Sequence, residues 1–314
     1  MSFLLRSWTD RDAGCDHEIS QEIYPEYREE PDHPAWFPAQ QLGAPSEYLS
    51  RYVAVDSKAG HPVAYTTLWE LRPRRYRFDL AVRPEWQGQG IATQLLDRVI
   101  DDAHRAAATG LQARVRDDKQ KALEFVIRRG FKESHRMGAY RIDLAEVDAC
   151  DFSQAFKQLG ERGIEVITLE EVRKQGSQGL RQFYDLYLAA REGWPDPDPD
   201  PAGSLPVPFA LVKRWLDEVR LPEAFFVARL ARQCVGFTSF FDIGTGVHPE
   251  FRRKGIATLL KAGSIADARQ RGLSGQTTST ASPGMQAVLE RLGYKRRWAE
   301  IRLIRETPVD RLEQ

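Results

Sequence analysis

The chain contains two short loops whose residue types could bind a phosphate group, and both share one sequence pattern. The first copy covers residues 82–96 (VRPEWQGQGIATQLL), and the second covers residues 247–261 (VHPEFRRKGIATLLK). Aligned without a gap, they share a valine, Pro-Glu, Gly-Ile-Ala-Thr and one leucine. Each loop leads into a segment with helical apolar spacing, so unpaired N–H groups and the helix dipole meet at the loop. Such an arrangement attracts anions and favours a ligand with a pyrophosphate.

Glycines and cations within the two loops support this interpretation. Gly88 and Gly90 would let a phosphate approach the backbone closely, because they carry no side chain. In the second copy Arg252, Arg253 and Lys254 add formal positive charge. An arginine can bind a phosphate through two parallel hydrogen bonds.

A plain strand-loop-helix connection and a dinucleotide-binding fold could also contain loops of this kind. A plain connection uses glycines in its turn, but repetition at identical spacing makes it less favoured. A dinucleotide-binding fold requires the pattern G-x-G-x-x-G. Thr93 stands at the third glycine position of the first copy, and Arg253 stands at the first glycine position of the second. We therefore set the dinucleotide fold aside.

The loop segments carry a resemblance to a known family. Residues 87–92 (QGQGIA) and 252–257 (RRKGIA) both fit Q/R-x-x-G-x-G/A, and the chain resembles the GNAT superfamily of acyl-CoA-dependent N-acyltransferases. The preceding V-x-P-E is also typical of that superfamily. The resemblance covers most of the chain as two consecutive domains. It implies an α/β (α+β) fold in which each domain is a mixed, mostly antiparallel twisted sheet flanked by helices.

The resemblance also implies acetyl-CoA as the cosubstrate. In the superfamily the loop amides hold the CoA pyrophosphate, and the valine-bearing strand pairs with the pantetheine arm and donates a backbone N–H to the oxyanion. The residues so assigned are Ala81, Val82, Gln87, Gly88, Gln89, Gly90, Ile91, Ala92 and Thr93 in the first copy, and Gly246, Val247, Arg252, Arg253, Lys254, Gly255, Ile256, Ala257 and Thr258 in the second.

Attack of an amine on an acetyl thioester needs a base that removes the amine proton. The superfamily's base is often a carboxylate on the strand before the loop. Asp79 occupies such a position in the first copy, and Gly244 aligns with it in the second. Asp79 is therefore the candidate base, and Glu70 is a second candidate. The alternative is that Asp79 is a strand-end carboxylate paired with a neighbouring arginine, Arg77 or Arg74.

The resemblance also predicts a general acid for the leaving thiolate. The superfamily usually has a tyrosine four residues before a Gly-Phe pair, but Val126 and Leu289 occupy these positions here. Tyr140, Tyr294 and His135 are the candidates to replace it. The alternative is a thiolate that leaves without a proton.

An acidic and aromatic region near the N-terminus is the candidate acceptor site. Residues 18–38 interleave carboxylates with aromatic side chains, and we assign Tyr24, Glu26, Tyr27 and Trp36 to substrate binding. The superfamily covers its acceptor site with this part of the fold. The alternative is a solvated helix followed by a proline-broken loop. The functional interpretation predicts a small cationic acceptor, with aminoglycosides, polyamines and amino acids left open.

The second copy has a similar region before its own loop. Tyr184 and Tyr187 lie on a predicted helix, and residues 195–201 (PDPDPDP) form an extended acidic segment after it. We assign the two tyrosines to substrate binding. The alternative for the acidic segment is a solvent-exposed spacer.

Apolar spacing and turn residues predict similar elements in both halves. In the first half we expect strands at 2–8, 51–56, 62–71, 78–82, 111–116 and 131–144, and helices from 9, at 91–108 and at 117–129. In the second half we expect strands at 164–169, 224–230, 234–241, 273–280 and 295–305, and helices at 177–191, 209–219, 256–271 and 283–292. The predicted limits are 1–145 and 164–314, with a helical connector at 146–163.

Bulk composition narrows the class of protein. The 314 residues include 45 Lys+Arg and 45 Asp+Glu. The sequence therefore lacks the excess of basic residues that is typical of nucleic-acid-binding proteins. No apolar run reaches membrane-spanning length. The first residues lack a basic segment before a long apolar core, so we expect no signal peptide. Cys15, Cys150 and Cys234 suggest no disulfide framework, and the histidines are scattered, so no metal is expected. We expect a cytoplasmic monomer or homodimer that acts on a small-molecule amine, with no nucleic-acid or membrane partner.

Two functions of different classes fit these observations. The first is an N-acetyltransferase that moves an acetyl group from acetyl-CoA to a primary amine by direct attack. The second is a sensor or scaffold that binds acyl-CoA, with one or both domains degenerate. Asp79 and a longer hairpin favour the first domain as the catalyst, whereas the more basic loop favours the second.

Overall fold

The computed structural model describes residues 2–26, 48–147, 152, 154–192, 207–219, 221–240 and 244–306. These residues divide into two compact units. Unit 1 holds the described residues of 2–136 together with 300–306, and unit 2 holds those of 137–299.

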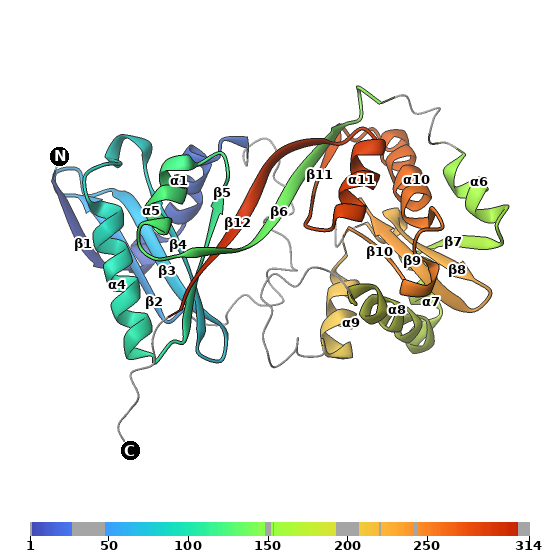
Figure 1. The fold of residues 1–314 in the computed structure, drawn as a ribbon, viewed down its shortest axis with the longest axis horizontal. Helices are drawn as coiled ribbons and strands as arrows, with labels where there is room; N and C mark the ends of the chain where they lie inside the picture. The colour runs from blue at the N-terminus through green and yellow to red at the C-terminus, as the bar shows by residue number, and fades with distance from the viewer. Residues whose placement is uncertain are drawn as a thin grey trace, which may run out of the picture. The chain divides into compact units, whose positions relative to one another are not determined.

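Unit 1 is built on strands that follow one another along the sheet. Neighbouring strands are antiparallel from β1 to β4, and β4 is parallel to β5. The elements, labelled in Figure 1, are β1 (Phe3–Ser7), α1 (Cys15–Ile23), β2 (Ser50–Asp56), β3 (Pro62–Arg72), β4 (Arg75–Val82), α4 (Ile91–Arg105), β5 (Gly110–Arg116), α5 (Gln120–Ile127) and β6 (Lys132–Asp143).

The two faces of the unit 1 sheet are covered by different helices. Alternate strand residues point to opposite faces. On one face Leu68, Phe78 and Leu111 pack in one buried cluster with Leu96 of α4 and Val126 of α5. On the other face, buried residues of β2 and β3 pack against the apolar side of α1. The loop before α4 is thus supported by a helix held against the sheet.

The parallel strands β4 and β5 diverge toward the first loop. Their ladder joins Arg75–Arg77 to Gly110–Gln112, whereas β4 continues to Val82 and β5 to Arg116. Between Arg77 and the loop, the backbone N–H and C=O groups of β4 that point toward β5 therefore have no strand partner among the described residues. We call this opening the β4–β5 fork.

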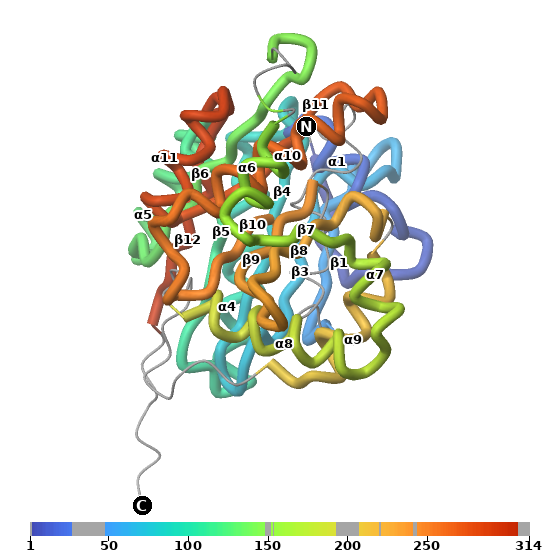
Figure 2. Tube along the Cα trace, turned by 90° about the vertical axis from the view of Figure 1, so that its right-hand side faces the viewer, coloured from blue at the N-terminus to red at the C-terminus, as the bar shows by residue number. Residues whose placement is uncertain are grey.

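Unit 2 repeats the plan with a shorter hairpin. Its elements are α6 (Ala155–Gly160), β7 (Ile164–Thr168), α7 (Leu169–Lys174), α8 (Gly176–Arg191), α9 (Phe209–Glu218), β8 (Phe225–Leu230), β9 (Gln233–Ser239), β10 (Thr245–Val247), α10 (Ile256–Gln270), β11 (Gly275–Thr280), α11 (Pro283–Arg291) and β12 (Lys295–Glu306). Strands β7 to β10 lie side by side in one sheet, as Figure 2 shows. Among the described residues β10 pairs only with β9, so no β10–β11 ladder matches the β4–β5 pairing of unit 1.

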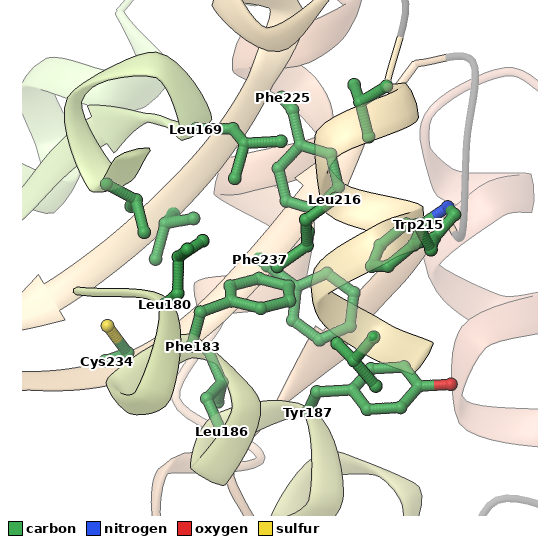
Figure 3. Close-up of a cluster of buried hydrophobic side chains, with 14 of the residues drawn as sticks. Leu169, Leu180, Phe183, Leu186, Tyr187, Trp215, Leu216, Phe225, Cys234 and Phe237 are labelled. Carbon is green, nitrogen blue, oxygen red and sulfur yellow. The ribbon is translucent and has the colours of Figure 1, made fainter. Parts of the chain in front are cut away.

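An aromatic core fills one face of this unit 2 sheet. Phe183 of α8 packs edge-on against Phe225 of β8 and Phe237 of β9, with ring centroids 5.6 and 5.3 Å away. Trp215 of α9 and Tyr187 of α8 complete the cluster, as Figure 3 shows. Ring pairs of this geometry add to the burial energy, so α8 and α9 are held firmly on the sheet.

The closing strand of each unit comes from the other half of the chain. Glu300–Glu306 of β12 pairs with Arg116–Gly110 of β5 in unit 1, and Gly138–Asp143 of β6 pairs with Thr280–Gly275 of β11 in unit 2. The sequence limits of 1–145 and 164–314 were drawn as consecutive segments and stay a prediction. The compact units differ from them by this exchange of closing strands.

The predicted fold class is confirmed, and most predicted elements are present. Several bounds differ by a few residues, as in α5, which was predicted at 117–129 and spans Gln120–Ile127. Three further segments differ from the prediction. Among its described residues the connector is helical only at Ala155–Gly160, and residues 145–147 form a turn and bend. A short 3-10 turn at Asp10–Asp12 precedes α1. Helix α7 was not predicted, although Thr168 and Glu171 form a capping box at its start.

Candidate functional site

The two loops have the same backbone conformation. Gly88 and Gly90 have φ angles of 78° and 82°, and the matching residues Arg253 and Gly255 have 61° and 77°. Glycine adopts this left-handed region without strain, whereas Arg253 is a rare non-glycine residue there. The shared conformation confirms that the repeat preserves a loop geometry as well as residue types.

The first signature residue ties each loop to the strand before it. The Gln87 Nε2 donates to the Val82 carbonyl at 3.1 Å, and the Arg252 Nε donates to the Val247 carbonyl at 3.1 Å. Arg252 Nη2 also donates to the carbonyls of Ala190 and Glu192 at 3.0 and 2.8 Å. The Nε and Nη2 of Arg252 thus donate to backbone carbonyls. Most of the guanidinium that we expected to bind a phosphate is therefore already hydrogen-bonded within the protein.

Each loop ends at the positive end of a long helix. The first helical hydrogen bond of α4 runs from the Gln94 N–H to the Gly90 carbonyl at 3.1 Å, and that of α10 runs from the Leu259 N–H to the Gly255 carbonyl at 3.0 Å. In each helix the three preceding N–H groups lie ahead of this bond. The first turns of α4 and α10 contain no acidic residue. Both loops therefore present N–H groups and a positive dipole end to an anion.

An arginine also lies beside the second loop. The Arg162 Nη1 donates to the Lys254 carbonyl at 2.9 Å, and a Cβ built on Gly255 would lie 3.4 Å from the same nitrogen. Arg162 belongs to the segment between α6 and β7, which has no counterpart in unit 1.

Comparison with known proteins identifies the repeated unit. Residues 17–131 and 180–294 each match the family model described as Acetyltransferase (GNAT) family. The chain belongs to the GNAT family. The two matches make it a tandem GNAT protein.

Solved structures have the same arrangement over the full chain. A GCN5-related N-acetyltransferase from Sphaerobacter thermophilus is similar, with a TM-score of 0.72, 17% identity, and coverage of 97% of this chain and 95% of that chain. A tandem GNAT protein from the clavulanic acid biosynthesis pathway has a TM-score of 0.65 and 17% identity, covering 98% and 99%. At these identities the likeness concerns the fold. No curated protein sequence matches the chain.

The candidate base of this GNAT chain lies at the fork. Asp79 is on β4, just beyond the last β4 residue that pairs with β5. Its side chain is 41% exposed, and its Oδ1 is 3.3 Å from Arg77 Nη2. The alternative pairing with Arg77 therefore exists, and it leaves the carboxylate open to solvent. Glu70 instead accepts the backbone N–H of Arg74 at 2.7 Å and caps the β3–β4 turn.

The tyrosines proposed as replacement acids lie in the core of unit 2. Tyr140 and Tyr294 are 2% and 3% exposed and belong to one apolar cluster. Tyr294 Oη donates to Gln276 Oε1, and burial raises the pKa of both tyrosines. Val126 and Leu289, at the usual tyrosine positions, are buried as well. His135 lies on β6 at intermediate exposure.

Two described carboxylates of the acidic region in unit 1 are paired with arginines. Glu26 forms an ion pair with Arg116 at the end of β5, and Glu22 pairs with Arg83. The Tyr24 ring lies 4.9 Å from the Arg116 guanidinium and 5.1 Å from Lys119 Nζ. The structure thus brings Tyr24 and Glu26 together, but in a mixed-charge cluster. The substrate predictions for Tyr27 and Trp36 lie outside the described residues.

The two tyrosines assigned to substrate in unit 2 take part in packing. Tyr184 Oη donates to the Val207 carbonyl at 2.7 Å, and its ring packs edge-on against Phe209. Tyr187 is 5% exposed and lies in the aromatic core of Figure 3. Both side chains hold α8 against its neighbours.

Sequence reasoning missed a buried lysine on the helix after the second loop. Lys261 is 1% exposed, and its Nζ donates to the Ser239 carbonyl at 3.4 Å. Burial lowers the pKa of Lys261 to about 7. The signal was present in the gapless alignment of the copies, where Lys261 replaces Leu96.

No membrane or metal feature is found in the part of the chain that the structure describes. None of its helices combines the length and apolar character of a membrane span. Its His, Cys, Asp and Glu side chains nowhere gather in threes as a metal would need. The expected lack of a metal stays a prediction.

Proposed function

We propose that this GNAT protein is an N-acetyltransferase that moves the acetyl group of acetyl-CoA to a primary amine. One observation carries the proposal. In both GNAT repeats the loop has left-handed residues at the same two positions and leads into the N-terminus of a long helix. We place the CoA pyrophosphate on these loop amides. The residues assigned from the sequence are the proposed contacts, except that Arg252 anchors the loop.

Unit 1 is proposed as the catalyst, because it has both a fork and a carboxylate. The thioester would lie in the β4–β5 fork, where a backbone N–H near Ala81 or Val82 donates to the oxyanion. Asp79 takes the amine proton, directly or through a water, as the new C–N bond forms. The C–S bond then breaks, and CoA leaves as the thiolate. Val126, at the usual tyrosine position, has no proton to give.

The acceptor is proposed to be a small amine that is cationic in solution. The exposed carboxylate of Asp79 supports this preference, because it would attract the ammonium form, which loses one proton to solvent before the neutral amine attacks. Glu22 and Glu26 add little, since arginines already pair with them.

A second candidate function applies to unit 2. Its β10 has only 3 residues, and Gly244 occupies the place of Asp79. No described residue pairs β10 with β11. These observations favour a unit 2 that binds acyl-CoA without turnover.

Titration calorimetry with acetyl-CoA tests the proposal. We expect two sites in the wild type and the loss of one site each in Gly90→Asp and Gly255→Asp, because aspartate places a negative charge at the phosphate. Gly90→Ala and Gly255→Ala are matched controls, since they cause the same positive-φ strain without the charge. A wild type that binds no acetyl-CoA would overturn the proposal.

Transfer assays with a panel of amines then separate the two function classes. Acetylation of any primary amine, retained in Gly255→Asp and lost in Gly90→Asp, would support catalysis by unit 1. Binding at both sites without transfer to any amine would favour the sensor or scaffold.

A further inference from the structure

One arginine outside the loop is fixed against the first turn of α4. Arg129 Nη2 donates to Thr93 Oγ1 at 2.7 Å, and Nη1 donates to the Phe125 carbonyl at 3.1 Å. Its guanidinium carbon lies 3.6 Å from the centroid of the Phe125 ring. Three separate contacts thus hold this cation beside the third residue of the helix.

The position is electrostatically unfavourable for the unit without a ligand. A cation near a helix N-terminus faces the positive end of the dipole. The first turn of α4 has no acidic residue, and no described carboxylate forms an ion pair with Arg129. By contrast, Arg77, Arg83 and Arg116 of the same unit do have carboxylate partners.

The arginine supplies a charge that the first loop lacks. Residues 87–90 (QGQG) are uncharged, whereas Arg253 and Lys254 lie in the second loop. At the position of Arg129, one residue before the Gly-Phe pair, unit 2 has Leu292, which is buried in an apolar cluster. The two units therefore place their positive charge on different elements around similar loops.

We propose that Arg129 binds a phosphate group of the CoA cosubstrate in unit 1. The guanidinium has five N–H donors, of which the structure uses two, so it can still form a bidentate contact with a phosphate oxygen pair. An anion at this place also relieves the repulsion between Arg129 and the helix dipole. This inference rests on the proposed function, because it takes acetyl-CoA as the ligand of the first loop.

The test measures acetyl-CoA and acetyl-3′-dephospho-CoA binding in the Gly255→Asp background, which leaves unit 1 as the binding site. Arg129→Gln should weaken acetyl-CoA binding about ten-fold, as expected for one lost charge-assisted contact. Arg129→Lys keeps the charge without the fork, so its loss should be smaller. Arg128→Gln is the matched control, since Arg128 is 76% exposed and pairs with Glu124 on the same helix. It should change the affinity less than two-fold.

The two ligands identify which phosphate is bound. A loss seen with acetyl-CoA but not with the dephospho ligand would assign Arg129 to the 3′-phosphate, and an equal loss with both would assign it to the pyrophosphate. Unchanged affinity of Arg129→Gln for both ligands, with wild-type binding intact, would overturn the inference alone. Lack of binding by the parent Gly255→Asp and the wild type would instead overturn the proposed function. Circular dichroism spectra that match those of the parent show that the variants are folded.

Discussion

The helices that follow the two loops rest on different cores. In unit 1 four buried positions on or beneath α4 are apolar, and in unit 2 the repeat-related residues are polar and also buried. The pairs are Leu96 with Lys261, Val99 with Ser264, Leu111 with Gln276, and Phe131 with Tyr294. The loops of the two units nevertheless have similar backbones, so the loop geometry does not require these four positions to be apolar.

Two buried polar side chains of unit 2 bind carbonyls at the end of β9. The Lys261 Nζ donates to the Ser239 carbonyl, and the Gln276 Nε2 donates to that of Phe240. Buried carbonyls need donors, and these side chains supply them. The apolar residues Leu96 and Leu111 at the matching positions of unit 1 have no group that could do so.

The largest effect should come from Asp79, the proposed base, because unit 2 has Gly244 at that position. Asp79→Asn should lower the rate of amine acetylation by roughly 10² to 10⁴ fold, because a general base is lost. The affinity for acetyl-CoA should stay unchanged, as measured by calorimetry. Glu70→Gln is the control and should leave the rate nearly intact, since Glu70 caps a turn. Full activity of Asp79→Asn would remove the basis for choosing unit 1.

Exchanging the core residues should affect stability by several kcal/mol. Leu96→Lys buries a cation within an apolar cluster, and we expect it to destabilise unit 1 by about 3 kcal/mol or more. Lys261→Met should stabilise unit 2 by at most roughly 1–3 kcal/mol, because it removes a buried amine but also removes a donor to the Ser239 carbonyl. Urea unfolding measures both changes. If Leu96→Lys leaves the stability of unit 1 unchanged, both cores accept a lysine at this position, and the inferred difference between the two cores would be wrong.

The same lysine should make the stability of unit 2 depend on pH. Because burial lowers the pKa of Lys261 to about 7, the unfolded chain binds one more proton than the folded chain above that pH. The free energy of unfolding should therefore rise with pH between about 7 and 10, by at most about 1.4 kcal/mol per pH unit. Below pH 7 this contribution is constant, since both states hold the proton.

Thermal melting of the wild type and Lys261→Met across this pH range measures the effect. The slope should be smaller in the variant. Burial raises the pKa of Tyr294 well above its ordinary value, so the tyrosine of the unfolded chain loses its proton first near pH 10 and lowers the stability there. This contribution is common to both proteins and cancels in the comparison. Equal slopes in both proteins would show that Lys261 keeps its ordinary pKa.

The sequence predicted the loops because their backbone places strict demands on residue type. Gly90 and Gly255 are both left-handed, and the pattern around them repeats. The exchange of closing strands was not predictable in this way, because the alternation in β6 and β12 fits any sheet edge of suitable polarity. Only the pairing of distant segments selects the partner, and that information is tertiary.

Individual side chains were harder to predict for a related reason. An arginine donates equally well to a phosphate and to a carbonyl, so residue type alone could not show that Arg252 anchors its loop. A lysine at the end of an apolar face usually extends its amine to water, which hid the burial of Lys261. Asp79 was proposed because strand position and repeat alignment both singled it out, and its role stays a prediction. Arg129 was missed, since its contact with Thr93 joins the turn after α5 to the first turn of α4.

The smallest effect should come from the side chains that anchor the two loops. Gln87→Ala removes one hydrogen bond to the Val82 carbonyl and should cost about 1 kcal/mol of stability. Arg252→Gln gives the second loop the anchor of the first: the bond to Val247 can persist, while those to Ala190 and Glu192 are lost. We expect this variant to weaken the link to α8 and to lower the melting temperature of unit 2, with acetyl-CoA affinity reduced less than three-fold. A large loss of affinity with an unchanged melting temperature would mean that Arg252 contacts the ligand after all, and the two loops would then differ in chemistry as well as in their supporting core.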